Sequence, residues 1–349
     1  MTLLSTIYAI AMAASSGGGE DHPAWAERCT QARAYSAERR GTTLLVVADG
    51  KTVCAAHQDN TPQELWSGTK SIVTLLAVMA VDDGLLALDE PVSDTIGEWR
   101  SNPAKAGITI RQLLTMTSGI PSQVGMPPGF VESLTVVPSH SVGERFLYGP
   151  APYQVFGELL RRKLSVGSTP ETIRSYANRR LFVPLEITGL VWRNGRDGNP
   201  LMPQGISLTG HDWAKIGALV EGGGCVGGKC YLSSEALNEL FKGSAANPAY
   251  GVGWWLPRST SSGDPITATF DLAENSEVVP TDLVASAGAG GQRLYVIPSR
   301  NLVIVRQASL DVASLRSGRA ASEDESKRWS DAVFLALLLG EDSTSNRGS

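Results

Sequence analysis

Apolar residues recur every three or four positions over residues 23–40, where Trp25, Cys29 and Ala32 share one face. This period predicts an amphipathic helix, and Gly41 is a natural end for it. Two apolar runs follow at residues 42–47 and 52–56, separated by an Asp-Gly turn signal. A helix and then a β-hairpin are therefore expected near the start of the chain.

Residues 67–83 are almost entirely apolar and stop at Gly84. A helix that is hydrophobic on every side is buried, so this one should begin deep between two parts of the molecule. Helical and loop-like patterns continue to about residue 240, with capped segments at 109–114, 153–164, 170–181 and 209–220. Strand patterns return late, at 266–270, 282–286, 292–297 and 302–307, before a last apolar helix at 329–339.

Strands at both ends of the chain with helices between them indicate an α+β fold. We expect one antiparallel sheet built from both chain ends, flanked by helices, with an inserted helical lobe. The length of 349 residues also favours two lobes over one. The expected ranges are 20–84 and 241–340 for the sheet lobe, 85–240 for a mainly helical lobe, and 341–349 for a polar tail.

The chain opens with an apolar run of about signal-peptide length, residues 3–14, and a Ser/Gly spacer at 15–19. No Lys or Arg precedes this run, so the usual positive start of a signal peptide is missing. No other stretch approaches the roughly 20 apolar residues of a membrane span. These features predict a periplasmic or secreted protein without a stable membrane span, in which residues 1–19 are a leader and spacer.

Composition narrows the classes of partner. Hydrophobic residues make up 42% of the chain, which excludes a fully disordered protein. The formal net charge is −5 and basic residues do not cluster. Nucleic acid is therefore not an expected partner, because a phosphate backbone binds concentrated positive charge. Oligomeric state is left open by these patterns.

Four cysteines fall in two local pairs: Cys29 and Cys54 bracket the first helix and hairpin, and Cys225 and Cys230 close a short glycine loop. Two disulfides are plausible in an oxidising compartment. The alternative for each cysteine is a small buried hydrophobic residue. Zinc is disfavoured because the C-x4-C spacing has no second close pair and histidines are few. No metal or other cofactor is expected.

Familiar catalytic and nucleotide-binding motifs are missing from the sequence. No serine lies in a G-x-S-x-G nucleophile elbow, and no histidine stands in a recognisable base motif. Residues 223–230 nearly match a phosphate-binding loop, but Cys230 replaces the metal-binding hydroxyl and the segment follows a helix instead of a strand.

The positive signal is Ser67-Gly68-Thr69-Lys70, an S-x-x-K motif at the start of the buried helix. Residues three apart share a helix face, so the Lys70 amine can reach the Ser67 hydroxyl. Burial and the helix dipole both disfavour a charged ammonium there, which would let Lys70 accept the serine proton. The spacing also arises by chance, and a capping serine beside a surface lysine is the alternative.

Further segments follow this motif in order: residues 83–92 (DGLLALDEPV), 108–120 (ITIRQLLTMTSGI), 209–217 and 250–255. Together with the S-x-x-K motif, they resemble the class C-like members of the serine β-lactamase and penicillin-binding-protein superfamily. The resemblance extends over roughly residues 40–310. The resemblance implies a β-lactamase/transpeptidase-like fold and a serine acyl-enzyme.

The resemblance places a second family motif, Y-x-N, at Tyr148-Gly149-Pro150. Tyr148 is then the implied acid/base partner of Ser67 and Lys70, and Tyr153 is the alternative if the register differs. Pro150 replaces an asparagine that would bind a substrate amide. A tyrosine here could also belong to the core.

A third family motif, K-T-G, corresponds to Ser286-Ala287-Gly288, without the lysine that helps to hold the carboxylate of a β-lactam. These small residues would let the strand backbone approach a substrate, and the Ala289 and Ser67 N–H groups would form the oxyanion hole. The simpler interpretation of this glycine run is a bulge or turn at a strand end.

Both departures from the family pattern suit a neutral ester or amide better than an anionic lactam. Trp66 and Trp254 are candidate substrate-binding residues beside Ser286, Ala287 and Gly288. Tyr250 and Trp255 are further possible neighbours, although each aromatic residue could equally belong to the core. Within the superfamily, the chain looks most like the esterase and 6-aminohexanoate-oligomer hydrolase branch.

The hypothesis from sequence is a serine hydrolase that cleaves a small-molecule carboxylic ester or amide through an acyl-enzyme. Two alternatives are kept. One is a β-lactamase or D-alanyl peptidase, and the other is a non-catalytic receptor for cell-wall fragments.

Overall fold

The computed structural model describes residues 22–57, 60–121, 126–166, 169–260, 263, 266–274, 277–310 and 328–340. The expected leader and spacer at residues 1–19 and the expected polar tail at 341–349 lie outside these ranges.

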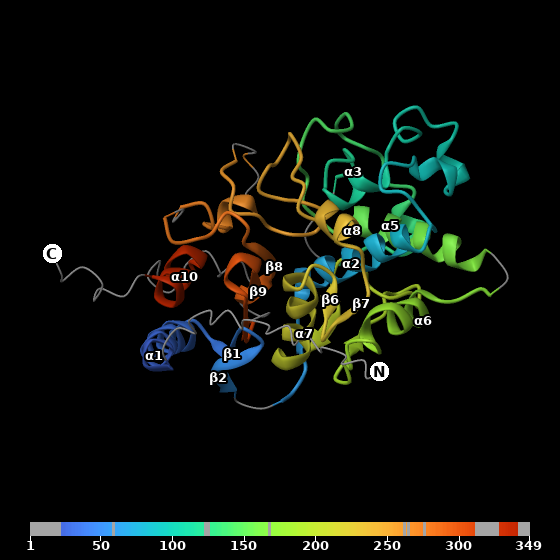
Figure 1. The fold of residues 1–349 in the computed structure, drawn as a ribbon. Coiled ribbons are helices and arrows are strands. Elements are labelled where there is room, and N and C mark those ends of the chain that lie inside the picture. Colours follow the sequence, from blue (N-terminus) through green and yellow to red (C-terminus); the bar gives the residue numbers. More distant parts are fainter. Residues whose placement is uncertain are drawn as a thin grey trace, which may run out of the picture.

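An antiparallel sheet of five strands, in the order β2-β1-β10-β9-β8, organises one half of the protein (Figure 1). The two ends of the chain build it together, as the sequence predicts. The first end supplies the hairpin of β1 (Gly41–Ala48) and β2 (Lys51–His57). The other end supplies β8 (Val284–Gly288), β9 (Gln292–Ile297) and β10 (Leu302–Ala308).

Strands β1 and β10 join the two ends of the chain at the centre of this sheet. Val46 lies opposite Ile304 in their antiparallel register, and Leu45 lies opposite Val305. All four of these side chains are buried, so the contact between the chain ends is part of the hydrophobic core.

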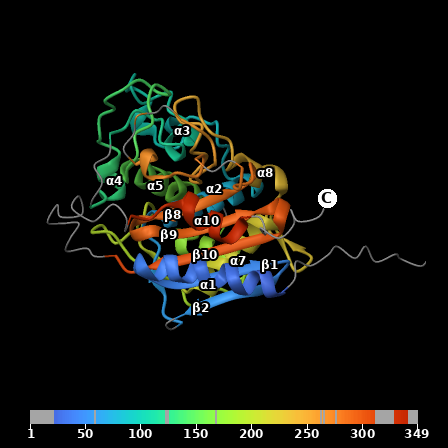
Figure 2. The same cartoon turned by 90° about the vertical axis from the view of Figure 1, so that its left-hand side faces the viewer.

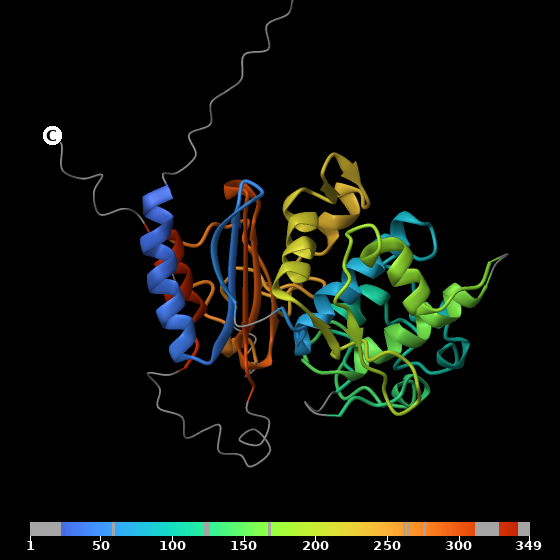
Figure 3. The ribbon, with the colours of Figure 1, turned by 90° about the horizontal axis from the view of Figure 1, so that it is seen from below.

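Helices cover both faces of the sheet (Figure 3). The outer face carries α1 (His22–Glu38) and α10 (Asp331–Leu339), which Figure 2 shows in front of the strands. On the inner face, α7 (Gly210–Glu221) packs against β1, β9 and β10. Gly217 makes this approach possible, because a Cβ there would lie 2.4 Å from Val303 Cγ1.

The helix α2 (Thr69–Asp82) is buried along most of its length, from Thr69 to Ala80. It follows a short 3-10 turn, η1 (Trp66–Gly68). The sequence predicts this burial from the apolar run, and the structure confirms it. The start of α2 is consequently held between the sheet and the helical part of the molecule.

The helical part and its connections contain several further helices and helical turns. They are η2 (Val92–Asp94), η3 (Gly97–Trp99), α3 (Ile110–Leu114), α4 (Phe130–Ser133), α5 (Ala151–Ser165), α6 (Ile173–Ala177), η4 (Asn178–Phe182) and α8 (Ser234–Glu239). A small sheet contains β3 (Gln63–Glu64), β5 (Ile206–Leu208) and β4 (Val191–Trp192), and a hairpin pairs β6 (Cys225–Val226) with β7 (Lys229–Cys230). Within the described part of the chain, no helix has both the length and the apolar character needed to cross a membrane.

Both expected disulfides are present. Cys29–Cys54 ties α1 to β2, and Cys225–Cys230 closes the β6–β7 hairpin. The first bridge fastens a helix of the outer face to the sheet that it covers, so it limits the conformations open to this end of the unfolded chain.

One predicted strand is wrong. Residues 266–270 do not form a strand; the structure has a 3-10 turn, η5 (Thr267–Thr269), at this place. The outer edge of β8 is occupied by Trp255, whose backbone N–H donates to Ala285 O at 2.8 Å and whose carbonyl accepts from Ala285 N at 2.9 Å. The β-branched residues of 266–270 suit a strand, but tertiary pairing gives that edge to another segment.

Candidate active site

Ser67 lies in the turn η1, directly before the buried helix α2. The small sheet anchors this turn from both sides: Leu65 N donates to Ile206 O at 2.8 Å, and Ile206 N donates to Thr69 Oγ1 at 3.2 Å. Trp66, directly before the serine, has a φ of 50°. This left-handed conformation is strained for a bulky residue, and strain of this kind is concentrated at functional sites.

Lys70 lies one helical turn after Ser67, with its side chain directed at the serine. Its Nζ donates to Ser67 Oγ at 3.0 Å and to the carbonyl oxygen of Pro203 at 3.0 Å. The residue is only 3% exposed. Burial lowers the pKa of Lys70 to about 7, because the ammonium loses its hydration. A neutral Lys70 can still donate to Pro203 while its lone pair accepts the Ser67 proton.

Two tyrosines lie near this amine. The ring centroid of Tyr148 is 4.8 Å from Lys70 Nζ, and that of Tyr153 is 5.8 Å away. Tyr153 is fully buried and its hydroxyl donates to Leu114 O at 3.1 Å. Burial also raises the pKa of Tyr153 above that of an ordinary phenol. Tyr148 is the nearer and less buried of the two, so it is the better candidate for proton transfer.

The end of β8 lies against the turn that holds Ser67. A Cβ on Gly288 would lie 2.0 Å from Leu65 O and 3.2 Å from Gly68 N. The structure therefore requires glycine at position 288, and the K-T-G-like segment does bring its backbone close to the turn that holds Ser67. Ala289 follows directly and is exposed.

Ser286 and Ala287 are buried within this strand end. The Ser286 hydroxyl donates to Gly68 O at 3.2 Å. Ser286 therefore secures β8 to the start of α2, and its hydroxyl is already engaged in that contact. The side chain at this position carries no positive charge toward a substrate.

The structure separates the neighbouring aromatic residues Trp254 and Trp255. Trp254 is fully buried and meets Phe241 edge-on at 5.9 Å between ring centroids, so its position is that of a core residue. Trp255 instead lies 5.9 Å from the Tyr148 ring and stacks on Phe270 at 3.9 Å. Adjacent residues of an extended segment point to opposite sides, which a list of aromatic residues does not reveal.

Two contacts were missed by the sequence reasoning. Pro203 supplies a carbonyl oxygen to Lys70, and a backbone acceptor leaves no signal in a residue pattern. Arg293 supplies a hydrogen bond to Gly288 O, and its place directly after the Gly-Gly-Gln run was the only hint. Across the described residues, no cluster of three or more His, Cys, Asp or Glu side chains is placed to hold a metal ion.

The model of the Beta-lactamase family matches residues 26–324. The chain belongs to the Beta-lactamase family. The resemblance drawn from its motifs is thereby confirmed, and so is the α+β fold.

This family member is similar to several known proteins. It is 27% identical over 180 residues to the acyltransferase mokF of Monascus pilosus, an alignment that covers 42% of each chain. The chain spans less than half the length of the curated relatives it matches. Among solved structures, the chain is similar to EstCE1, which is described as a hydrolase with promiscuous acyltransferase activity. The TM-score is 0.67 and the sequence identity 15%, and the match covers 91% of this chain and 99% of EstCE1. A family VIII carboxylesterase is similar with a TM-score of 0.60 and 14% identity, covering 86% and 97%.

Proposed function

We propose that this protein is a serine hydrolase that cleaves a neutral carboxylic ester or amide through an acyl-enzyme on Ser67. The observation that carries the proposal is the buried Lys70 amine, 3.0 Å from the Ser67 hydroxyl, with a pKa lowered to about 7. Near neutral pH a substantial fraction of this amine is uncharged, so it can act as the general base.

The reaction has two steps. In the first, Ser67 Oγ attacks the substrate carbonyl carbon while its proton passes to Lys70, and the N–H groups of Ser67 and Ala289 bind the developing oxyanion. Tyr148 relays the proton to the leaving alcohol or amine as the carbon–heteroatom bond breaks. In the second, water attacks the acyl carbon while its proton passes to Lys70. The bond from that carbon to Ser67 Oγ then breaks, Lys70 returns the proton to Ser67 Oγ, and the acid leaves as product.

The preference for a neutral substrate rests on the strand end beside Ser67. Residues 284–289 include no charged side chain, and the Ser286 hydroxyl is engaged with Gly68 O. Pro150 offers no side-chain donor or acceptor at the position where the family motif has an asparagine. An anionic lactam would therefore lack the charge partner that its carboxylate needs.

We also infer that the protein works in an oxidising compartment, periplasmic or extracellular. All four cysteines pair in the structure, and disulfides persist mainly in such compartments. The apolar run at residues 3–14 supports the same inference from the sequence.

Labelling with a fluorophosphonate probe, followed by mass spectrometry, tests the mechanism directly. We expect the probe on Ser67, no labelling of Ser67→Ala, and a loss of p-nitrophenyl butyrate turnover of at least about 10³-fold in both Ser67→Ala and Lys70→Met. Ser93→Ala is the matched control, because the Ser93 hydroxyl only donates to Ala106 O at 2.8 Å. Turnover that survives in Ser67→Ala would refute the mechanism, and a wild-type protein that neither reacts nor turns over any ester or amide would favour the receptor alternative.

Parallel substrates separate the related reactions. A chromogenic cephalosporin and a peptide ending in D-Ala-D-Ala test for β-lactamase and D-alanyl peptidase activity, and rapid turnover of either would replace the ester proposal. Butanol added to the p-nitrophenyl butyrate assay tests acyl transfer, which the Monascus relative's description suggests. Formation of butyl butyrate in place of butyrate would show that an alcohol can replace water in the second step.

A further inference from the structure

A three-residue turn, η6 (Ala289–Gly291), joins β8 to β9 directly after the strand end that lies against Ser67. Gly290 and Gly291 have φ values of 75° and 78°, which residues with a Cβ rarely adopt. This turn carries the Ala289 N–H that the proposed mechanism uses. Its conformation therefore determines where that donor points.

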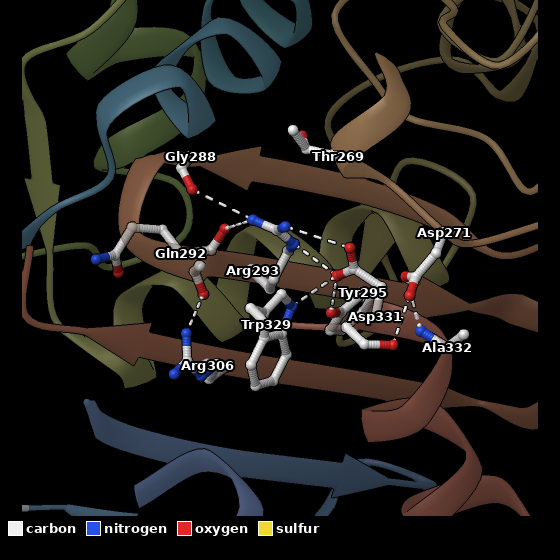
Figure 4. A network of polar contacts seen from close by, with 12 residues as sticks. Thr269, Asp271, Gly288, Gln292, Arg293, Tyr295, Arg306, Trp329, Asp331 and Ala332 are labelled. Carbon is white, nitrogen blue, oxygen red and sulfur yellow. Dashed lines mark hydrogen bonds and ion pairs between the residues drawn. The ribbon is translucent and has the colours of Figure 1, made fainter. Parts of the chain in front are cut away.

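One side of the turn is held by Arg293, which is buried on β9. Its Nη1 donates to Gly288 O at 3.2 Å and to Gln292 O at 3.1 Å (Figure 4). The same guanidinium forms a two-point contact with Asp331 of α10, through Nε at 2.6 Å and Nη2 at 3.2 Å. A single planar group thus connects the outer helix to the two ends of the turn.

A second buried arginine, Arg306 on β10, holds the rest of the turn. Its Nη1 donates to Gly291 O at 2.8 Å and to Gly290 O at 3.2 Å. Its Nε donates to Ser36 Oγ of α1 at 3.1 Å. The packing is tight, because a Cβ on Gly291 would lie 2.2 Å from Arg306 Nη1.

The carboxylate of Asp331 is itself fixed by further donors. Tyr295 Oη donates to Asp331 Oδ1 at 2.5 Å, and Trp329 Nε1 donates to the same oxygen at 3.0 Å. Asp331 is fully buried. The carboxylate thus accepts hydrogen bonds from Arg293, Tyr295 and Trp329, which give it a well-defined orientation. It can therefore hold the Arg293 guanidinium in one position.

From these contacts we propose that Arg293 and Arg306 are positioning residues that fix the Ala289 N–H for the oxyanion. The inference deepens the proposed function and rests on it. The Gly288 carbonyl and the Ala289 N–H belong to one planar peptide unit, so a hydrogen bond that fixes the first also fixes the second. Donation to that carbonyl polarises the peptide and strengthens its N–H as a donor.

The Arg293→Lys variant tests this role. A lysine can still pair with Asp331, but its single ammonium lacks the fork that reaches Asp331, Gly288 O and Gln292 O together. We expect kcat for p-nitrophenyl butyrate to fall roughly 10- to 100-fold with KM nearly unchanged, because the oxyanion contact is made mainly in the transition state. The inhibition constant of phenylboronic acid, which bonds to the serine as a tetrahedral adduct, should rise by a similar factor.

Asp331→Asn provides a second variant, because it removes the charge that orients Arg293 and should act in the same direction. Arg162→Met is the matched control for stability alone. Arg162 also pairs with a buried carboxylate, Glu158, at 2.7 Å, and with Glu98 at 2.7 Å, near the C-terminal end of α5. The Arg162→Met substitution should lower the unfolding temperature, while kcat and the boronate inhibition constant stay within about twofold of wild type.

The outcomes separate the two proposals. If Arg293→Lys and Asp331→Asn lose stability like Arg162→Met but keep kcat and boronate binding, the positioning role is wrong while the hydrolase proposal stands. If Arg293→Lys does not fold, Asp331→Asn and Arg306→Lys decide by the same two measurements. If the wild-type protein is not labelled at Ser67 and turns over no substrate, the hydrolase proposal fails before the variants are compared.

Discussion

The Lys70 amine changes its charge in the range where an enzyme of this kind would work. Its pKa is lowered to about 7 by burial, and the neutral form is the one that can accept the Ser67 proton. The ionised form predominates below this pKa, so the fraction of competent base falls as the pH falls.

The pH dependence of kcat/KM should therefore rise through about pH 7 and level off above it. The measurement is p-nitrophenyl butyrate hydrolysis from pH 5.5 to 9, corrected for spontaneous hydrolysis. A profile that is already flat at pH 5.5 would point to a carboxylate base and contradict the role of Lys70.

At the residue scale, the sequence reasoning succeeded where spacing determines geometry. The three-residue interval from Ser67 to Lys70 predicts that the two side chains meet, and they lie 3.0 Å apart. The sequence favours Trp254 over Trp255 as a substrate-binding residue, whereas the structure places Trp255 beside Tyr148. The side on which each ring lies depends on the pairing of Trp255 with Ala285 of β8. Pro203 could not be found, since its contribution is a backbone carbonyl.

At the scale of elements, β8 approaches the turn η1 closely. The backbone of Gly288 passes so near that a methyl group would lie 2.0 Å from Leu65 O. One of the two elements would have to move, and a shift of this size separates the end of β8 from Ser67.

We expect Gly288→Ala to lower kcat/KM at least about 100-fold, since small displacements of catalytic groups are costly. It should also lower the free energy of unfolding by about 1–3 kcal/mol through overpacking. Gly107→Ala is the control, because a Cβ at Gly107 meets no atom within 4 Å. Ester assays and chemical denaturation of both variants provide the measurements, and equal activity in the two would show that β8 need not approach η1.

Elements with a strong periodic pattern were predictable. The buried α2, the first hairpin and the pair β9–β10 follow from apolar runs and turn signals. Residues 266–270 were predicted as a strand because of their β-branched composition, yet Trp255 occupies the sheet edge. Local propensity does not determine which segment pairs with the edge of a sheet.

At the scale of the whole molecule, charge should influence which substrates react. The chain carries a formal net charge of −5, and residues 284–289, the strand end beside Ser67, include no cationic side chain. An anionic substrate would be repelled over distances comparable with the Debye length.

We expect kcat/KM at pH 7.5 to be at least about tenfold higher for p-nitrophenyl butyrate than for mono-p-nitrophenyl succinate, which adds one carboxylate. The ratio should shrink as ionic strength rises from about 0.02 to 0.5 M, because salt screens the repulsion. A preference for the anionic ester would instead indicate a cationic subsite and contradict the neutral-substrate proposal.

The architecture of the whole molecule could be inferred from the order of the patterns along the chain. Strands at both ends and helices between them leave few topologies other than a shared sheet with an insertion. The network of Arg293, Arg306 and Asp331 could not be inferred, because an arginine in a strand is usually exposed. Its burial depends on α1 and α10 meeting over the same face of the sheet.

The pairing of β1 with β10 also has a consequence for synthesis. Ser67 and Lys70 are synthesised long before β8, β9 and β10, which follow them in the chain. Until those strands exist, β1 lacks its partner and the turn η1 lacks the strand end at Gly288. A growing chain that has not reached β8 would therefore hold Ser67 without the strand end that carries the proposed oxyanion donor, and the proposed reaction would have to await the synthesis of β8 to β10.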